Sequence, residues 1–263
     1  MAGKIMWRIS SKPLAAAGIF AGQMLYAIHR PDLPYFEDQD PTGVFGDPRL
    51  PPFRIVFLGD STITSPGVDP LDACWARQTA RHFASRHHVE LISLAQGGSK
   101  AMDVVANQVD AVDGLDADLA FLSVGGNDGL RFTPIARFEE AYEQIISRLV
   151  DAAPAVAVSG VGDLGMIPRL PSLARGASRV RGRSIDSAIA RVVSRYPGVV
   201  KSDTWHPMWD AFYHDLDLWG ADRFHASAKG HELFSRAAIP AAEAALTASR
   251  TVPARSGSAG SST

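Results

Sequence analysis

The apolar run from Ile55 to Leu58 is the feature that most restricts how this chain of 263 residues can fold. The run has no alternating polar side chains, which is typical of a strand buried on both faces of a parallel sheet. It stops at Gly59, where the backbone can turn tightly, and is followed by Asp60 and Ser61. Ligands in open α/β sheets bind just beyond the carboxyl ends of the strands, so Ser61 stands where a ligand is expected.

From Phe53 onward, strand-like and helix-like segments alternate, which favours βαβ units joined by right-handed crossovers. Short apolar runs predict strands at 54–59, 88–94, 118–124, 154–160 and 198–202. Longer stretches predict helices near 72–86, 101–111, 134–151, 184–195 and 228–247. The sequence therefore predicts an α/β domain with a parallel five-stranded sheet.

Composition sets the domain limits and excludes some partners. With 46% hydrophobic and 21% charged residues, the chain can bury a core as one domain, which we place at 53–247. A proline-rich segment at 31–52 reads as an extended linker, and a Ser/Ala/Gly-rich segment at 248–263 as a disordered tail. The net charge of -2, without a long Lys or Arg run, argues against nucleic acid as a partner. The single cysteine, Cys74, excludes an intrachain disulfide and is interpreted as a packing residue.

The first thirty residues differ from the rest of the chain. Lys4, Arg8 and Lys12 precede an apolar stretch at 13–28, which is shorter than the ~20 residues that cross a bilayer. Residues 1–30 are therefore either a signal or anchor, or a helix packed on the domain or lying on a membrane surface. The location stays correspondingly open between membrane-associated or exported and cytoplasmic, and the oligomeric state is not indicated.

Three later segments carry polar groups suited to acyl chemistry. Gly97 and Gly98 follow the second predicted strand, where their bare backbone can approach a ligand, and Asn127 follows the third. An asparagine side chain donates hydrogen bonds to an oxyanion, which a carboxylate cannot do. Asp222 and His225 have a spacing that lets the carboxylate accept from Nδ1–H and hold Nε2 toward Ser61.

A second acid and histidine pair has the same spacing. Asp203 and His206 follow the fifth predicted strand, so spacing alone does not choose between His206 and His225. Aromatic neighbours make His206 equally suited to a packed, structural role. Each motif taken singly is also compatible with an ordinary turn or helix cap.

The four blocks in this order resemble those of the SGNH, or GDSL-type, serine hydrolases. Gly59-Asp60-Ser61 resembles the nucleophile block, Gly98 the oxyanion glycine, Gly126-Asn127-Asp128 the asparagine block, and the Asp222 to His225 segment the closing block. The resemblance covers about residues 53–245 and implies a three-layer α/β/α sandwich with a flavodoxin-like sheet. The chain departs from the family at Ser65, Ser93 and Ala226, where glycine, asparagine and proline are common.

The resemblance implies a serine esterase that hydrolyses carboxylic esters with small-acyl, aryl or lipid-like groups, without a cofactor or metal. Ser61 would be the nucleophile, His225 the base and Asp222 its orienting acid, with Ser61, Gly98 and Asn127 forming the oxyanion hole. The same site would serve an acyltransferase or a carbohydrate O-acetylesterase. The remaining alternative is a non-catalytic flavodoxin-like binding module, which no complete Gly-x-Gly-x-x-Gly or Walker motif supports.

Two further groups of residues remain to be assigned. Arg131, just after the asparagine block, lies either at the mouth of the cleft or in a surface ion pair. The segment 164–183 is expected to form loops that shape the acyl pocket. The same expectation applies to a run of aromatic residues, namely Trp205, Trp209, Phe212, Tyr213 and Trp219.

Overall fold

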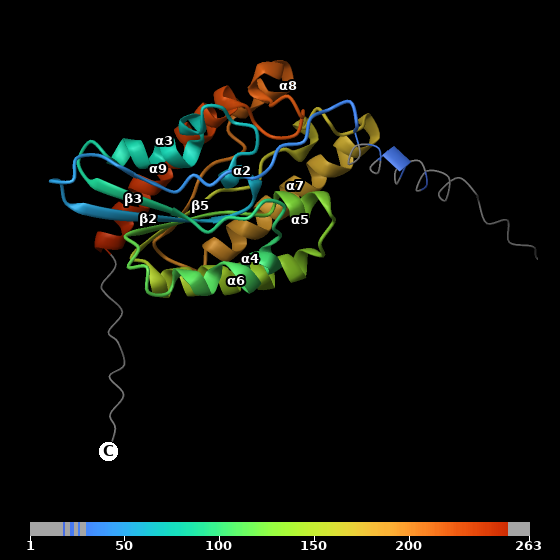
Figure 1. Cartoon of the computed structure of the whole chain (residues 1–263). Coiled ribbons are helices and arrows are strands. Elements are labelled where there is room, and N and C mark those ends of the chain that lie inside the picture. The colour runs from blue at the N-terminus through green and yellow to red at the C-terminus, as the bar shows by residue number, and fades with distance from the viewer. Residues whose placement is uncertain (1–17, 19–21, 24–25, 27–29, 252–263) are drawn as a thin grey trace, which may run out of the picture.

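The computed structural model describes residues 18, 22–23, 26 and 30–251 (Figure 1). The predictions for residues 1–30 lie almost entirely outside this part of the chain, as does the predicted tail beyond Thr251. Within the described part, no helix combines the length and the apolar character that crossing a bilayer requires.

Five parallel strands form the body of the sheet and confirm the five predicted strands. They are β2 (Pro52–Gly59), β3 (His88–Ser93), β4 (Leu119–Ser123), β5 (Ala155–Val158) and β6 (Val199–Lys201). Their order in the sheet is β3-β2-β4-β5-β6, which is flavodoxin-like. The chain leaves β2 for β3 on one side and returns to β4 on the other, so the strand order reverses at β2. Ser61 directly follows β2 and therefore lies at this switch point.

A sixth strand corrects the prediction of a purely parallel sheet. β1 (Gly43–Phe45) pairs antiparallel with β3, which makes the sheet mixed. It belongs to the segment 31–52, where the prolines predict an extended linker, and it attaches part of that segment to the domain. A strand of three residues is too short to give a periodic pattern. The ring of Phe45 lies under the guanidinium groups of Arg77 and Arg81, each 5.6 Å from the ring centroid.

Helices cover both faces of the sheet, as predicted for a three-layer sandwich (Figure 1). The α-helices are α2 (Ser61–Thr64), α3 (Trp75–Phe83), α4 (Ala101–Asn107), α5 (Gly126–Leu130), α6 (Ile135–Ala152), α7 (Ser172–Val193), α8 (Ala211–His214) and α9 (Ala228–Thr251). The 3-10 turns are η1 (Leu71–Ala73), η2 (Val109–Val112), η3 (Leu164–Met166), η4 (Pro207–Asp210) and η5 (Leu216–Leu218). α9 extends past the predicted domain limit of residue 247 into the predicted tail.

α7 corrects a second prediction, because it begins at Ser172 rather than near 184. Its first half falls in the segment expected to be loops, where arginines and glycines obscure an amphipathic pattern. The buried positions there are the small residues Ala174, Ser178 and Gly182, four apart in sequence. A Cβ on Gly182 would lie 2.6 Å from the carbonyl oxygen of Gly162, so small side chains let α7 pack directly on the loop before η3.

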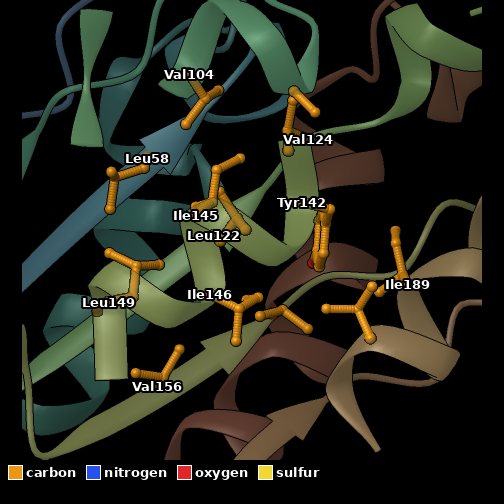
Figure 2. Close-up of a cluster of buried hydrophobic side chains, with 14 of the residues drawn as sticks. Leu58, Val104, Leu122, Val124, Tyr142, Ile145, Ile146, Leu149, Val156 and Ile189 are labelled. Atoms are coloured by element: carbon orange, nitrogen blue, oxygen red, sulfur yellow. The ribbon is translucent and has the colours of Figure 1, made fainter. Parts of the chain in front are cut away.

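The core explains why the strands read as continuous apolar runs. Val56 and Leu58 face the helices α4, α6 and α7, whereas Ile55 and Phe57 face α3 and α9. Figure 2 shows the first of these clusters, where Tyr142 and Ile145 of α6 lie close to Leu122 of β4. Because successive strand residues alternate between two buried faces, each strand has to be apolar at nearly every position.

Candidate active site

The turn after β2 presents Ser61 at the edge of the sheet. Gly59 has a φ of +146°, and a Cβ built on it would lie 1.9 Å from the carbonyl oxygen of Ser123, so only glycine fits there. The N–H of Asp60 donates to that same carbonyl at 3.1 Å. The Asp60 carboxylate accepts from the N–H of Thr62 at 3.0 Å and caps the short helix α2, which begins with Ser61.

Ser61, His225 and Asp222 form a continuous hydrogen-bonded chain. The Oγ of Ser61 lies 3.1 Å from Nε2 of His225, and Nδ1 of His225 lies 2.6 Å from Oδ2 of Asp222. The Asp222 side chain is 4% exposed and that of His225 is 23% exposed, so the acid is buried while the base is open to a substrate. The geometry is that of a nucleophile, a base and an orienting acid.

The charge of Asp222 determines which nitrogen of His225 carries the proton. Burial raises the pKa of Asp222, but the hydrogen bond and charge of His225 outweigh it, and the pKa lies below its usual value. An ionised carboxylate only accepts, so Nδ1 of His225 carries the proton and Nε2 is the acceptor for the Ser61 hydroxyl. His225 is thus prepared to act as a base toward Ser61.

A tight turn holds Asp222 and His225 together, whereas the rival histidine lies elsewhere. Oδ1 of Asp222 accepts from the backbone N–H groups of Phe224 and His225, each at 3.0 Å. Arg223, between them, has a φ of +57° in the left-handed region. His206 is exposed, and its Nδ1 accepts from the N–H of Met208 at 3.1 Å as the cap of η4. The structure therefore brings His225, and not His206, to Ser61.

Of the three predicted oxyanion donors, Ser61 and Asn127 line one cavity, whereas Gly98 is not among the residues that line it. Among the described residues, the backbone N–H groups of Ser61 and Gly98 donate to no other residue. Gly98 has a φ of +75°, which turns its peptide group in a way that favours glycine. Nδ2 of Asn127 donates to the carbonyl of Ser99 at 3.2 Å and lies 3.5 Å from Oδ2 of Asp60. The second contact is long, so one amide hydrogen is weakly held and can turn to a ligand.

Two buried residues hold these segments in register, and one of them, Gln108, is not indicated by the sequence. The side-chain amide of Gln108 accepts from the N–H of Gly59 at 2.8 Å and donates to its carbonyl at 2.9 Å. Oδ2 of Asp128 accepts from the N–H of Ala101 at 2.9 Å and joins α5 to the start of α4. Asp128 is part of a recognised motif, but Gln108 is a single polar residue after a helix, and its spacing carries no signal.

Asp60 is a buried carboxyl beside the site, and its ionisation is costly. Burial raises the pKa of Asp60 to about 6, although the N–H and hydroxyl of Thr62 and the charge of His225 act in the opposite direction. Between about pH 4 and pH 6 the folded protein therefore keeps a proton on Asp60 that the unfolded chain has lost. Folded stability falls as pH rises through this window.

We expect the substitution Asp60→Asn to remove this pH dependence, because an amide does not titrate and still caps α2. Relative to Asp60→Asn, the wild-type protein should lose roughly 3 kcal/mol of unfolding free energy between about pH 4 and pH 6.5. Urea unfolding of both proteins across this range measures how each unfolding free energy changes with pH. A difference between the two proteins that is the same at every pH does not affect this comparison. Parallel stability curves would contradict the assignment.

A cavity of about 210 Å³ opens beside Ser61 and continues between the sheet and α9. Its lining is mainly apolar and includes Trp75, Phe121, Trp209, Phe212, Trp219 and Phe234. Ser61, Asn127 and His225 line the same cavity. A buried polar residue also contributes, since Nδ1 of His231 accepts from the N–H of Trp75 at 3.2 Å and burial lowers the pKa of His231 to about 3.

The segments expected to shape the pocket contribute unequally. Trp209, Phe212 and Trp219 line the cavity, as do Leu164, Met166 and Ile167. Trp205 and Tyr213 do not line it and instead anchor loops. The Trp205 indole donates to the carbonyl of Val161, and the Tyr213 hydroxyl bonds to Asp163 and Arg179. Ser65 stands where glycine is common in the family that the sequence resembles. Its φ of +52° lies in the left-handed region that favours glycine, so the serine is held in a strained backbone conformation.

In the part of the chain that the structure describes, no group of three or more His, Cys, Asp or Glu side chains is arranged to hold a metal ion. The buried cysteine, Cys74, has its pKa raised by burial, which suits a packing role at the start of α3.

Comparisons with known proteins extend the resemblance. A profile of the GDSL-like Lipase/Acylhydrolase family matches residues 57–233. A GDSL-like esterase of Mycobacterium tuberculosis is 28% identical over 259 residues, which span 91% of this chain and 81% of that protein. A psychrotrophic esterase from Pseudoalteromonas sp. superposes with a TM-score of 0.58 at 15% identity, covering 74% of this chain and 98% of the other. An acetylxylan esterase from Geobacillus stearothermophilus gives 0.52 at 13% identity, covering 73% and 93%. The two solved structures support the fold alone.

Proposed function

The chain belongs to the GDSL-like lipase/acylhydrolase family of ester hydrolases, and from this premise we propose that it hydrolyses carboxylic esters through an acyl-enzyme on Ser61. The single observation that carries the proposal is the hydrogen-bonded chain from Ser61 through His225 to Asp222. Family membership also argues against the non-catalytic binding module.

In the first half of the reaction, Nε2 of His225 takes the proton from Ser61 as Oγ forms a bond to the acyl carbon. The carbonyl oxygen becomes an oxyanion, which accepts from the N–H groups of Ser61 and Gly98 and from Nδ2 of Asn127. Asp222 stabilises the imidazolium. The carbon–oxygen bond to the alcohol then breaks, and His225 returns the proton to the leaving alkoxide.

In the second half, His225 removes a proton from water, whose oxygen attacks the acyl-enzyme, and the same donors hold the second oxyanion. The bond to Ser61 breaks, the serine recovers its proton from His225, and the carboxylic acid leaves. An alcohol in place of water would give acyl transfer. Measuring the transesterification product in the presence of added alcohol or glycan separates hydrolysis from transfer.

The cavity supports an apolar acyl group as the part of the substrate that is buried. Its volume of about 210 Å³ exceeds the ~150 Å³ of an apolar cavity that holds benzene, so it has room for an acyl chain of about six carbons. Aromatic and aliphatic walls favour such a chain over a sugar or a charged group. The substrate class we propose is therefore esters of short to medium-length acids.

Hydrolysis of p-nitrophenyl esters from acetate to palmitate tests this proposal. We expect kcat/KM to be highest near hexanoate and to fall for dodecanoate and longer chains, which exceed the cavity. Mass spectrometry of the protein quenched during turnover should detect the acyl group on the peptide that contains Ser61. Absence of hydrolysis across the whole series would overturn the proposal for these esters.

Filling the cavity should shorten the preferred acyl chain. Ala237 lines the cavity from α9, and Ala237→Leu adds three carbon atoms to its wall. We expect kcat/KM for hexanoate to fall about tenfold while acetate changes about twofold or less, since one misfitted group in an apolar pocket has effects of this size. Ala244→Leu is the matched control, because Ala244 is exposed on the same helix and does not line this cavity. Equal losses for both esters in Ala237→Leu would argue against the cavity as the acyl site.

A further inference from the structure

A positive charge lies beside the glycine of the oxyanion hole. A Cβ built on Gly98 would lie 3.7 Å from Nη2 of Arg131, and nothing else comes within 4 Å of that position. Arg131 ends α5, and its N–H donates to the carbonyl of Asn127 at 2.9 Å. Residues four apart on a helical turn share a face, so Arg131 and Asn127 project toward the same edge.

This charge is not neutralised by the protein. Arg131 is exposed, and among the described residues no carboxylate forms an ion pair or hydrogen bond with its guanidinium. Some other exposed or half-exposed arginines do pair with carboxylates, as in the pairs of Arg54 with Glu90 and Arg191 with Glu139. A guanidinium without a partner beside a catalytic loop is available to a ligand.

The other charges at this loop are already engaged or are positive. Asp38 accepts from the N–H of Gly97 at 2.8 Å and from the hydroxyl of Thr64 at 2.6 Å, so its carboxylate holds the loop. Asp103 accepts from the N–H of Lys100 at 2.9 Å at the start of α4. The side-chain charge of Lys100 adds to the positive potential near Asp128, whose pKa it lowers against the larger effect of burial.

Arg131 lies outside the cavity assigned to the acyl chain. Asn127 and Leu130 line the acyl cavity, but Arg131 does not. With the acyl chain in the cavity and the carbonyl oxygen at Gly98 and Asn127, the alcohol portion of the ester extends toward the exposed rim. A group bound by Arg131 would therefore belong to the alcohol portion of the ester, because the acyl chain occupies the cavity that Arg131 does not line.

We propose that Arg131 forms an anion subsite for the alcohol portion of the substrate, so that the preferred esters carry a carboxylate or phosphate group there. The inference rests on the proposed function, because it uses Ser61 and the oxyanion hole to orient the ester. The planar guanidinium can bind either anion with two parallel hydrogen bonds, which a lysine cannot reproduce.

A pair of chromogenic esters with the same acyl group tests the subsite. One is p-nitrophenyl acetate, and the other is its analogue with a carboxylate on the ring, meta to the ester oxygen. In the wild-type protein, Arg131 should favour the carboxylated ester, and Arg131→Gln should lower its kcat/KM about tenfold, as expected for a bidentate charge pair at the rim of a site. The uncharged ester should change about twofold or less, and Arg131→Lys should recover only part of the loss.

Arg137→Gln is the matched control, since Arg137 is an exposed arginine on α6 that does not approach Gly98. It should leave the ratio of the two esters at the wild-type value. Equal losses on both esters in Arg131→Gln would overturn the subsite, because they would indicate a general effect on the oxyanion. An unchanged ratio would also overturn it.

A binding measurement keeps this test separate from the proposed function. Equilibrium titration measures the affinity of two proteins for the carboxylated ester, the Ser61→Ala variant and the same variant with Arg131→Gln added. The Ser61→Ala variant should bind this ester about tenfold more tightly than the double variant. If the wild-type protein hydrolyses neither ester but this difference is present, the proposed function fails for these esters and the subsite stands. If hydrolysis occurs but both affinities are equal, the subsite fails and the proposed function stands.

Discussion

Replacing Ser61 with alanine is expected to lower kcat for ester hydrolysis by about 10⁴-fold to 10⁶-fold, because it removes the hydroxyl that is hydrogen-bonded to the base, His225. His225→Ala should cause a loss of similar size, since the hydroxyl then lacks a base at 3.1 Å. Initial rates on p-nitrophenyl hexanoate measure both effects. Residues that act as a unit give non-additive losses, so the double variant should be no slower than the worse single variant.

His206→Ala is the control for these variants, because His206 has the same spacing from an aspartate but caps η4 on the surface. It should keep wild-type activity. Folding should be unaffected in Ser61→Ala, since its side chain makes one described hydrogen bond, to His225. Hydrolysis by Ser61→Ala at the wild-type rate, or loss of activity in His206→Ala alone, would refute the proposed triad.

Asn127→Ala should lower kcat by about 10²-fold to 10³-fold, because an oxyanion donor acts on charge that appears only in the transition state. KM should change little, since the uncharged carbonyl of the ground state gains less from the same donor. Asn127→Asp should be at least as slow, because an ionised carboxylate accepts hydrogen bonds and repels the oxyanion. Stopped-flow measurement of acylation and steady-state kinetics on one ester give both constants.

Stability provides the control for Asn127. The side-chain amide also donates to the carbonyl of Ser99 at 3.2 Å, so Asn127→Ala should cost about 1 kcal/mol of unfolding free energy. A Tm close to that of the wild-type protein, together with a large loss of kcat, assigns the effect to catalysis. An Asn127→Ala protein with full kcat would remove Asn127 from the oxyanion hole.

Much of the fold was predictable because strands buried on both faces have a continuous apolar sequence that can be recognised locally. Strands such as β2 and β4 are apolar at nearly every position, so their place in the chain is visible without any contact information. β1 was not predictable, because a strand of three residues depends on the free edge of β3 for its formation. The first half of α7 was missed for a related reason, since its buried face consists of small residues that fit the loop before η3.

The candidate site likewise has features that the local sequence indicates and features that depend on contacts between distant residues. Gly59, Gly98 and Gly125 all have positive φ angles, so each glycine marks a turn that the adjacent polar residue requires. The hydrogen bonds of Gln108 to Gly59 depend on the helix that follows β3, and nothing in the spacing indicates them. The sequence leaves Arg131 open between the cleft mouth and an ion pair, and only the packing of α5 shows its approach to Gly98.

The sequence by itself determined the α/β class and the five parallel strands, because these follow from local periodicity, while the candidate roles of Ser61, Asn127 and the Asp222–His225 pair rest on the resemblance of four ordered blocks to a known family. Spacing alone does not choose between His225 and His206; the family resemblance indicates His225, and the tertiary structure places its Nε2 3.1 Å from Oγ of Ser61. Tertiary structure also decided the cavity beside Ser61, whose walls come from β4, α8 and α9, and the position of Arg131. Such choices rest on contacts between residues far apart in the chain, and these form only when the crossovers pack against the sheet.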